Sequence, residues 1–345
     1  MTWLLVAVVT VAALVIGTWS AFRLSPWPLV LLIRHLPALS GEALNDRLAG
    51  LVPDGVASVV DERYDDADRD AYLDVFRPAG SAALPTIVWV HGGAFIAGTR
   101  LDIRNYLRIL ADRGFTTVGV EYSHAPERRY PTPILQVTAA LRYLQQHADR
   151  LGVDPDRIVL AGDSAGAQIA GQTALALCDR EFAAKAGLPL VPPAVRIRAT
   201  VLACGPYDLH LPDYQGQYGR FLRAIMWAYT GTKDFESDPR VACASLPQHV
   251  SAHFPPTFLT VGNGDPLRRH SVALAEALRA AGAPVDTLFY PDDHTPLLDH
   301  EYQLDVTTEA GAAALERIVA HVDAYTSAER PVRPSGPSRR GAARD

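Results

Sequence analysis

Cysteine is scarce in this sequence, which contains only Cys178, Cys204 and Cys243. A low and odd cysteine count gives no disulfide framework, and it favours a reducing compartment over a secreted one. The sequence also lacks a Cys-x-x-Cys pair and a His-Glu-x-x-His motif, which are common signatures of zinc sites. We therefore expect neither a metal site nor a bound cofactor.

An excess of positive charge is missing as well. Lys and Arg number 32 against 38 Asp and Glu, which gives a formal net charge of -6 at pH 7. This balance argues against nucleic-acid binding as the main task, because nucleic-acid-binding proteins present a basic surface. The sequence has no internal repeat, and 48% of its residues are hydrophobic, enough to bury a substantial core.

Residues 3–22 contain no charged side chain. Twenty residues of helix span about 30 Å, the thickness of a bilayer core, so we expect a membrane anchor over residues 1–23. No basic residue precedes the apolar run, which disfavours the alternative of a signal peptide. Arg23 and Arg34 follow it and favour a cytoplasmic catalytic domain. A buried core helix is a further alternative, and residues 24–50 are expected to form an interfacial segment or a cap over the site.

Short apolar runs alternate with helix-like stretches between residues 51 and 326. This alternation predicts a mostly parallel central sheet covered by helices on both faces. The first two strands are expected to form an antiparallel edge. We expect a cap insertion after the sixth strand, at about residues 210–243, and a disordered tail over residues 327–345. The expected strands are 56–60, 71–76, 86–90, 116–120, 157–161, 199–203, 256–261 and 285–290; the expected helices are 105–113, 131–150, 167–177, 220–229, 268–281 and 308–325.

The motif Gly162-Asp163-Ser164-Ala165-Gly166 stands between an expected strand and an expected helix. It has the form G-x-S-x-G of a nucleophile elbow, in which a strained turn presents a serine hydroxyl at the top of a sheet. Its glycines permit the tight turn and close packing of the helix on the strand. The motif predicts Ser164 as a catalytic nucleophile, although a plain turn of small residues fits the same letters.

A serine nucleophile needs a base within hydrogen-bond reach and an acid that orients the base. Asp265 follows an expected strand in a glycine-rich turn, and Asp208 is its main rival. His294 directly follows the last strand, whereas His300 lies six residues further on, where the loop would have to curl back. We therefore predict Asp265 and His294. The order of serine, acid and histidine along the chain then matches that of the α/β-hydrolase fold.

Backbone N–H groups must also stabilise the oxyanion that forms during attack on a carbonyl. One such donor is expected at Ala165, directly after the nucleophile. The segment His91-Gly92-Gly93-Ala94 ends an early central strand, and its glycines let the backbone approach a substrate closely. We predict Gly92 and Gly93 as the other donors, with His91 holding the loop by hydrogen bonds.

These segments together resemble the hormone-sensitive-lipase-like branch of the α/β-hydrolases, the bacterial family IV esterases. The resemblance covers about residues 70–325. It implies Ser164 as nucleophile, His294 as base and Asp265 as its partner, with an oxyanion hole at Gly92, Gly93 and Ala165. The matching segments are His91-Gly92-Gly93-Ala94-Phe95, Glu121-Tyr122-Ser123-His124-Ala125-Pro126-Glu127, Gly162-Asp163-Ser164-Ala165-Gly166, Gly264-Asp265-Pro266-Leu267 and His294.

The sequence departs from the family pattern at a few positions. Ala94 replaces a frequent third glycine, which preserves the backbone N–H, and Ser123-His124 changes residues expected to shape the pocket. The apolar N-terminus and His294-Thr295 are also similar to isoprenylcysteine methylesterase and formamidase-like relatives. We expect a membrane-anchored serine carboxylesterase acting on a small-molecule ester, lipid esters included. The alternatives are an amide or formamide hydrolase with the same mechanism, and a hydrolase-fold ligand-binding protein without catalysis.

Overall fold

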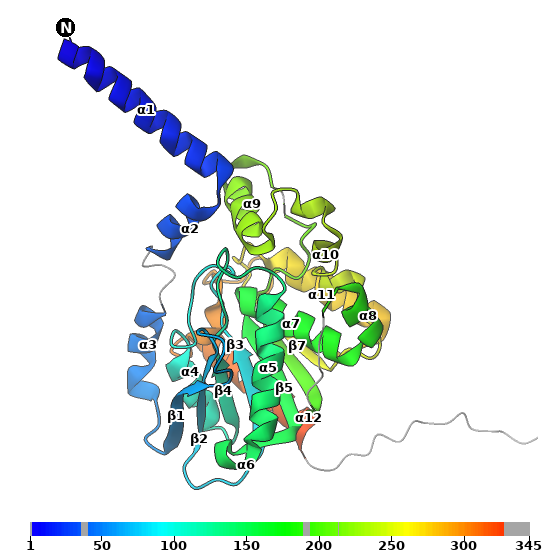
Figure 1. The fold of residues 1–345 in the computed structure, drawn as a ribbon. Coiled ribbons are helices and arrows are strands. Elements are labelled where there is room, and N and C mark those ends of the chain that lie inside the picture. Colours follow the sequence, from blue (N-terminus) through cyan, green and yellow to red (C-terminus); the bar gives the residue numbers. More distant parts are fainter. Residues whose placement is uncertain (1, 36–40, 189–193, 213, 328–345) are drawn as a thin grey trace, which may run out of the picture.

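The computed structural model describes residues 2–35, 41–188, 194–212 and 214–327. Its centre is an eight-stranded sheet in the order β1-β2-β4-β3-β5-β6-β7-β8 (Figure 1). β1 and β2 pair antiparallel, as do β2 and β4, and the remaining neighbours are parallel. The strands are β1 (Val56–Arg63), β2 (Tyr72–Pro78), β3 (Leu84–Val90), β4 (Thr116–Val120), β5 (Val153–Asp163), β6 (Ile197–Ala203), β7 (Thr257–Val261) and β8 (Val285–Phe289).

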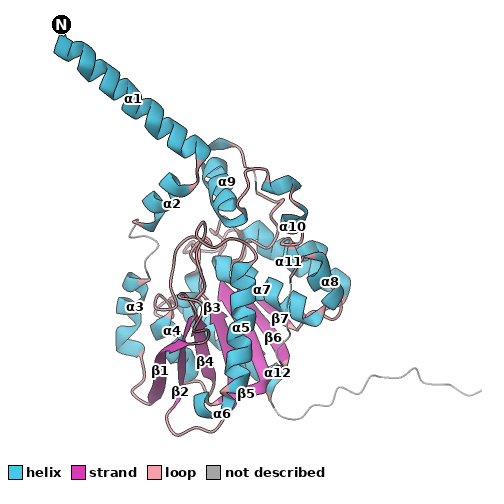
Figure 2. Ribbon diagram, viewed as in Figure 1, coloured by secondary structure: helices cyan, strands magenta, loops and turns pink. Residues whose placement is uncertain are grey.

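Helices cover both faces of the sheet (Figure 2). Their bounds are α1 (Thr2–Leu24), α2 (Trp27–Arg34), α3 (Glu42–Leu48), α4 (Arg104–Ala111), α5 (Thr132–Gln146), α6 (Ala148–Leu151), α7 (Ser164–Cys178), α8 (Arg180–Lys185), α9 (Gly216–Thr230), α10 (Pro239–Ala242), α11 (Arg268–Ala281) and α12 (Glu309–Thr326), with short 3-10 turns η2 (Ala49–Leu51), η3 (Phe235–Ser237), η4 (Leu246–Gln248) and η5 (Tyr302–Leu304). The expected fold class, a mostly parallel sheet between helices, is confirmed.

The central strands are apolar on both faces because both faces are covered. All five residues of β4 and of β7 are buried. Successive residues of β3 face opposite layers: Trp89 belongs to the core cluster under α4 and α12, and Val88 to the cluster under α5 and α7. This double burial produces the continuous apolar runs from which the sequence predicts central strands.

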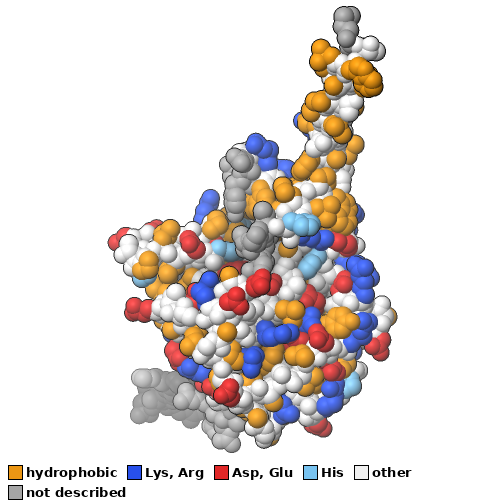
Figure 3. Space-filling view, turned by 90° about the vertical axis from the view of Figure 1, so that its left-hand side faces the viewer, with side chains coloured by type: hydrophobic (Ala, Val, Ile, Leu, Met, Phe, Trp, Pro, Cys, Tyr) orange, Lys and Arg blue, Asp and Glu red, His pale blue; other side chains and the backbone are white. Residues whose placement is uncertain are grey.

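The N-terminal helix α1 projects away from the body of the molecule, and none of its residues is buried (Figures 1 and 3). Its 23 residues are long and apolar enough to cross a membrane, a property that a signal sequence near an N-terminus shares. α2 follows directly and packs against α9, which lies in the segment expected as an inserted cap. Of the expected tail over residues 327–345, only Ser327 belongs to the described residues.

Candidate active site

Ser164 lies at the turn between β5 and α7, where the chain passes from strand to helix. Its backbone φ is 49°, in the left-handed region that residues other than glycine seldom adopt. A Cβ at Gly166 would lie 2.1 Å from the Val90 carbonyl oxygen, so only glycine permits this approach of α7 to β3. The strained turn thus presents the serine hydroxyl at the carboxyl end of the sheet, as the elbow motif predicts.

His300, not His294, lies beside the serine. Nε2 of His300 is 2.9 Å from Ser164 Oγ, and Nδ1 is 2.8 Å from Oδ2 of Asp265. Asp265 follows β7 and is almost fully buried. The ring of His294 instead packs against Tyr290, with their centroids 4.5 Å apart. The sequence-based choice of His294 is therefore wrong in position by six residues, and His300 replaces it.

The loop after β8 curls back because it is bonded to the turn after β7. The Asn263 side chain accepts from the Leu298 N–H at 2.9 Å and donates to the His294 carbonyl at 2.9 Å. A Cβ at Gly262 would lie 2.1 Å from the Leu298 carbonyl oxygen, so this glycine lets the loop approach. These contacts fold the loop onto the sheet and bring His300 over Asp265. No local signal in the sequence indicates this arrangement, because it depends on contacts between two loops.

The rival acid Asp208 lies outside this hydrogen-bonded chain. Its carboxylate accepts the N–H of His210, two residues further on, at 3.0 Å. Its own N–H donates to Nδ1 of His270 at 3.2 Å. Asp208 thus stabilises its own loop, and Asp265 is the carboxylate that orients His300.

Opposing effects act on the protonation of His300. Burial alone lowers the pKa of His300, and the hydrogen bond to Asp265 acts in the opposite direction. Burial raises the pKa of the Cys204 thiol to about 11, so Cys204 is neutral at pH 7. The Asp265 carboxylate is then placed where it could stabilise an imidazolium at His300.

Of the three predicted oxyanion donors, Gly92 is already engaged. Its N–H donates to Oδ2 of Asp163 at 2.8 Å, which corrects its predicted role. Ala165 is the second residue of α7, where a helical N–H has no partner within the helix. Within the described part of the chain, the N–H groups of Gly93 and Ala94 have no hydrogen-bond acceptor either. Gly93 and Ala165 thus stay available, and Ala94, whose backbone N–H was noted from the sequence without being predicted as a donor, joins them as a candidate.

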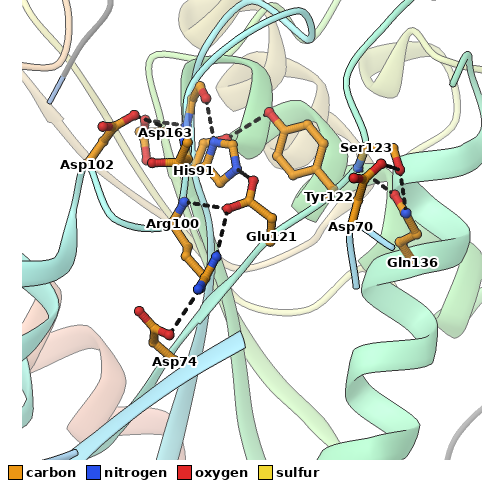
Figure 4. A network of polar contacts seen from close by, with 12 residues as sticks. Asp70, Asp74, His91, Arg100, Asp102, Glu121, Tyr122, Ser123, Gln136 and Asp163 are labelled. Atoms are coloured by element: carbon orange, nitrogen blue, oxygen red, sulfur yellow. Dashed lines mark hydrogen bonds and ion pairs between the residues drawn. The ribbon is translucent and has the colours of Figure 1, made fainter. Parts of the chain in front are cut away.

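A buried polar network holds residues 91–94, here called the oxyanion loop, in position (Figure 4). The His91 ring contacts the Gly92 carbonyl through Nδ1 at 2.7 Å and Glu121 through Nε2 at 3.1 Å, and it stacks on Tyr122. Arg100 donates to Glu121 from its backbone and its guanidinium, both at 3.2 Å. Burial alone would raise the pKa of Glu121, but His91 and Arg100 lower it to about 2. His91 therefore anchors the loop and faces away from proton transfer.

Two groups of side chains in the described ranges have three potential metal ligands within 4.8 Å of one another: His91, Glu121 and His124, and Cys204, Asp265 and His300. In the first group the Arg100 guanidinium bonds the same carboxylate, so its positive charge opposes a cation. In the second, His300 and Asp265 bond each other and Ser164. Hydrogen bonds therefore account for His91, Glu121, Asp265 and His300, whereas the buried Nε2 of His124 has no hydrogen-bond partner in the part of the chain that the structure describes.

A cavity of about 1140 Å³ lies over Ser164 and His300. Apolar side chains from three cap helices line it, including Ile33 of α2, Leu44 of α3, and Phe221 and Met226 of α9. Polar side chains line the cavity as well, among them Asp163 and His300 beside the serine and Arg47 and Glu309. Such a cavity suits a substrate with a polar reacting group and apolar substituents.

Comparisons with known proteins agree with this fold. A family model named Abhydrolase_3, described as alpha/beta hydrolase fold, matches residues 87–295. An acetyl esterase of Salmonella paratyphi B is 28% identical over 239 residues, covering 65% of this chain and 69% of that protein. Esterase B from Lactobacillus Rhamnosis has a TM-score of 0.71 at 22% identity, covering 83% of this chain and 96% of its own. A Pyrobaculum calidifontis esterase has a TM-score of 0.69 at 23% identity, with coverages of 87% and 94%.

The family model covers more than half of the chain, including the oxyanion loop and the elbow, and it ends before His300. The solved structures, at their low identity, support the fold alone. The resemblance predicted from the sequence motifs is confirmed: the chain belongs to the Abhydrolase_3 family, the hormone-sensitive-lipase-like branch of the α/β-hydrolases.

Proposed function

We propose that this chain is a serine carboxylesterase in which Ser164, His300 and Asp265 form the catalytic triad. The observation that carries the proposal is the continuous hydrogen-bonded chain from Ser164 Oγ through the His300 ring to Asp265, at 2.9 and 2.8 Å. It lies at the floor of an apolar cavity. Such an arrangement supplies a nucleophile, a base and an orienting acid in contact.

In the first half-reaction, Ser164 Oγ attacks the ester carbonyl carbon while His300 Nε2 takes the serine proton. The negative oxygen of the tetrahedral intermediate accepts hydrogen bonds from the backbone N–H groups of Ala165 and Gly93. His300 then gives its proton to the departing alkoxide, and the alcohol leaves an acyl-Ser164. Water attacks this acyl group with His300 again as base, which releases the carboxylic acid and restores the serine.

The substrate is an ester with apolar substituents, including lipid esters. The apolar lining from α2, α3 and α9 supports this assignment. The similar Salmonella protein is named an acetyl esterase, so a short acyl group is the first substrate to test. We further propose that α1 anchors the chain in a membrane with the catalytic domain on the cytoplasmic side, because a basic residue, Arg23, ends the helix and none precedes it.

Amide or formamide hydrolysis is the alternative within the same chemistry, and a hydrolase-fold receptor without catalysis is the alternative outside it. Steady-state hydrolysis of nitrophenyl esters of increasing acyl length, measured beside a formamide substrate, separates the first two. A fluorophosphonate probe should label the full-length protein once, at Ser164, and Ser164→Ala should abolish labelling and hydrolysis. A protein that neither turns over esters nor reacts with the probe is a receptor instead.

A further inference from the structure

Two carboxyl groups meet beneath the oxyanion loop, and the proposed triad uses neither. Asp163 precedes the nucleophile, and Glu301 follows His300; their side chains are hydrogen-bonded to each other. A Cβ at Gly92 would lie 2.5 Å from Oδ2 of Asp163 and 2.6 Å from Oε1 of Glu301, so both oxygens lie against this glycine. Oε1 of Glu301 is also 3.7 Å from Nε2 of His300.

Asp163 is the hydrogen-bond acceptor of this carboxyl pair. It is 2% exposed, and its oxygens accept from the indole N–H of Trp89 at 2.6 Å and from the Gly92 N–H at 2.8 Å. Both donors favour its ionised form. Two carboxylates in contact cannot both ionise without strong repulsion, so the hydrogen bond between them requires a proton on the other partner, Glu301.

The groups around the pair do not remove the need for this proton. Burial and the charge of Asp163 raise the pKa of Glu301 to about 8, while His300 acts in the opposite direction. Asp265 adds negative charge from the loop after β7. On the side of Asp163, burial raises the pKa of the carboxyl, and the hydrogen bonds from Trp89 and Glu301 and the charge of His91 act in the opposite direction. Buried hydroxyl and thiol groups face the same region without charge, namely Tyr106, Tyr122 and Cys204.

We propose, on the basis of the esterase function above, that Glu301 is a positioning residue that works as a neutral acid, donating its proton to Asp163. In this state Asp163 still accepts the hydrogen bond from the Gly92 N–H, which keeps the oxyanion loop in position. The neutral carboxyl also leaves His300 free of a second anion at its reactive nitrogen. A negative Glu301 would compete with Ser164 and with the departing alkoxide for the imidazolium proton.

The sign of the pH dependence follows from the raised pKa. The proton is present below about pH 8 and passes to water or hydroxide in the cavity as the pH rises through that value. One third of the Glu301 side chain, 34%, stays accessible, and the residue lines the cavity, so this exchange has a path. We expect the esterase rate to fall on the alkaline side as the two carboxylates repel each other.

The test is the pH profile of kcat/KM on nitrophenyl acetate for the full-length protein, from about pH 6 to about pH 10. Glu301→Gln supplies an uncharged donor of the same shape. Asp299→Asn is the matched control, because it changes the carboxylate on the other side of His300 in the same cavity. Between the plateau below about pH 8 and the alkaline end of the profile, we expect kcat/KM of wild type and of Asp299→Asn to fall about tenfold. Over the same range, kcat/KM of Glu301→Gln should fall less than about twofold. Parallel profiles for all three proteins would overturn the proposal.

Two further measurements keep this test independent of variant folding and of the substrate. Carbon NMR of wild type with labelled glutamate should show one glutamate carboxyl that titrates near pH 8, and its absence would refute the protonated state. The rate of fluorophosphonate labelling of Ser164 should follow the same alkaline limb. Labelling without ester turnover would leave the role of Glu301 intact while rejecting the proposed substrate class.

Discussion

Arg34, at the end of α2, donates two parallel hydrogen bonds of 2.7 and 2.8 Å to the Glu127 carboxylate. The same guanidinium donates to the Ile96 carbonyl at 2.7 Å. Ile96 belongs to the turn that follows the oxyanion loop, where its N–H donates to the Gly93 carbonyl at 3.1 Å. The helix next to the apolar N-terminus is thereby hydrogen-bonded to the turn that follows Gly93, a proposed oxyanion donor.

Replacing Arg34 should therefore reduce activity. Neither Arg34→Gln nor Arg34→Lys can reproduce the two parallel hydrogen bonds of the planar guanidinium to Glu127. We therefore expect kcat to fall severalfold while KM changes little, and the free energy of unfolding to fall by about 1–3 kcal/mol. Arg69→Gln is the control, because Arg69 forms an ion pair with Asp70 from a side chain that is 79% exposed. Such exposed pairs contribute little. Equal effects of the two glutamine variants would argue against a link between α2 and the loop.

The two histidines of the loop after β8 should differ sharply. His300→Ala removes the group between Ser164 and Asp265, and we expect kcat/KM to fall on the order of 10⁴-fold or more. His294→Ala removes only packing against Tyr290 and should change the rate a few-fold at most. Ester hydrolysis and fluorophosphonate labelling of both variants measure the difference. A larger loss in His294→Ala would restore the sequence-based choice.

Gly262 is a test of how the loop is held. Gly262→Ala places a methyl group against the Leu298 carbonyl, which overpacks the contact and should cost about 1–3 kcal/mol of stability. Because this contact brings His300 to the serine, activity at low temperature should fall before the fold is lost. Gly55→Ala is the control, since no atom lies within 4 Å of its added Cβ. The free energy of unfolding in denaturant and kcat are measured for both variants and compared with those of the wild type. Full activity in a folded Gly262→Ala protein would contradict this account.

The N-terminal helix should keep the full-length chain in the membrane fraction. α1 is exposed along its whole length in the structure and carries no acidic residue in its first turn. We expect a C-terminally tagged protein to resist an alkaline carbonate wash, to retain its N-terminus by mass spectrometry and to be protected from protease in intact cells. A soluble protein that begins near residue 23 would instead identify α1 as a cleaved signal sequence, and digestion from outside would reverse the topology.

The sequence predicts the parts of this molecule that depend on neighbouring residues along the chain. The run before Ser164 and the glycines around it fix a strand, a turn and a helix locally, so the position of Ser164 at the turn between strand and helix could be predicted. His300 could not, because its place depends on contacts between two loops, those of Asn263 with Leu298 and His294. Gly92 was misassigned for a similar reason: the group that takes its N–H, Asp163, comes from another strand.

Glu301 adopts a left-handed backbone conformation, with φ of 62° and ψ of 25°. A side chain in that conformation costs about 1 kcal/mol relative to glycine. Glycine at this position would relieve this strain, but it would also remove the hydrogen-bond partner of the buried Asp163. The measured thermal stability of a Glu301→Gly variant therefore reports which of these two opposing effects is larger.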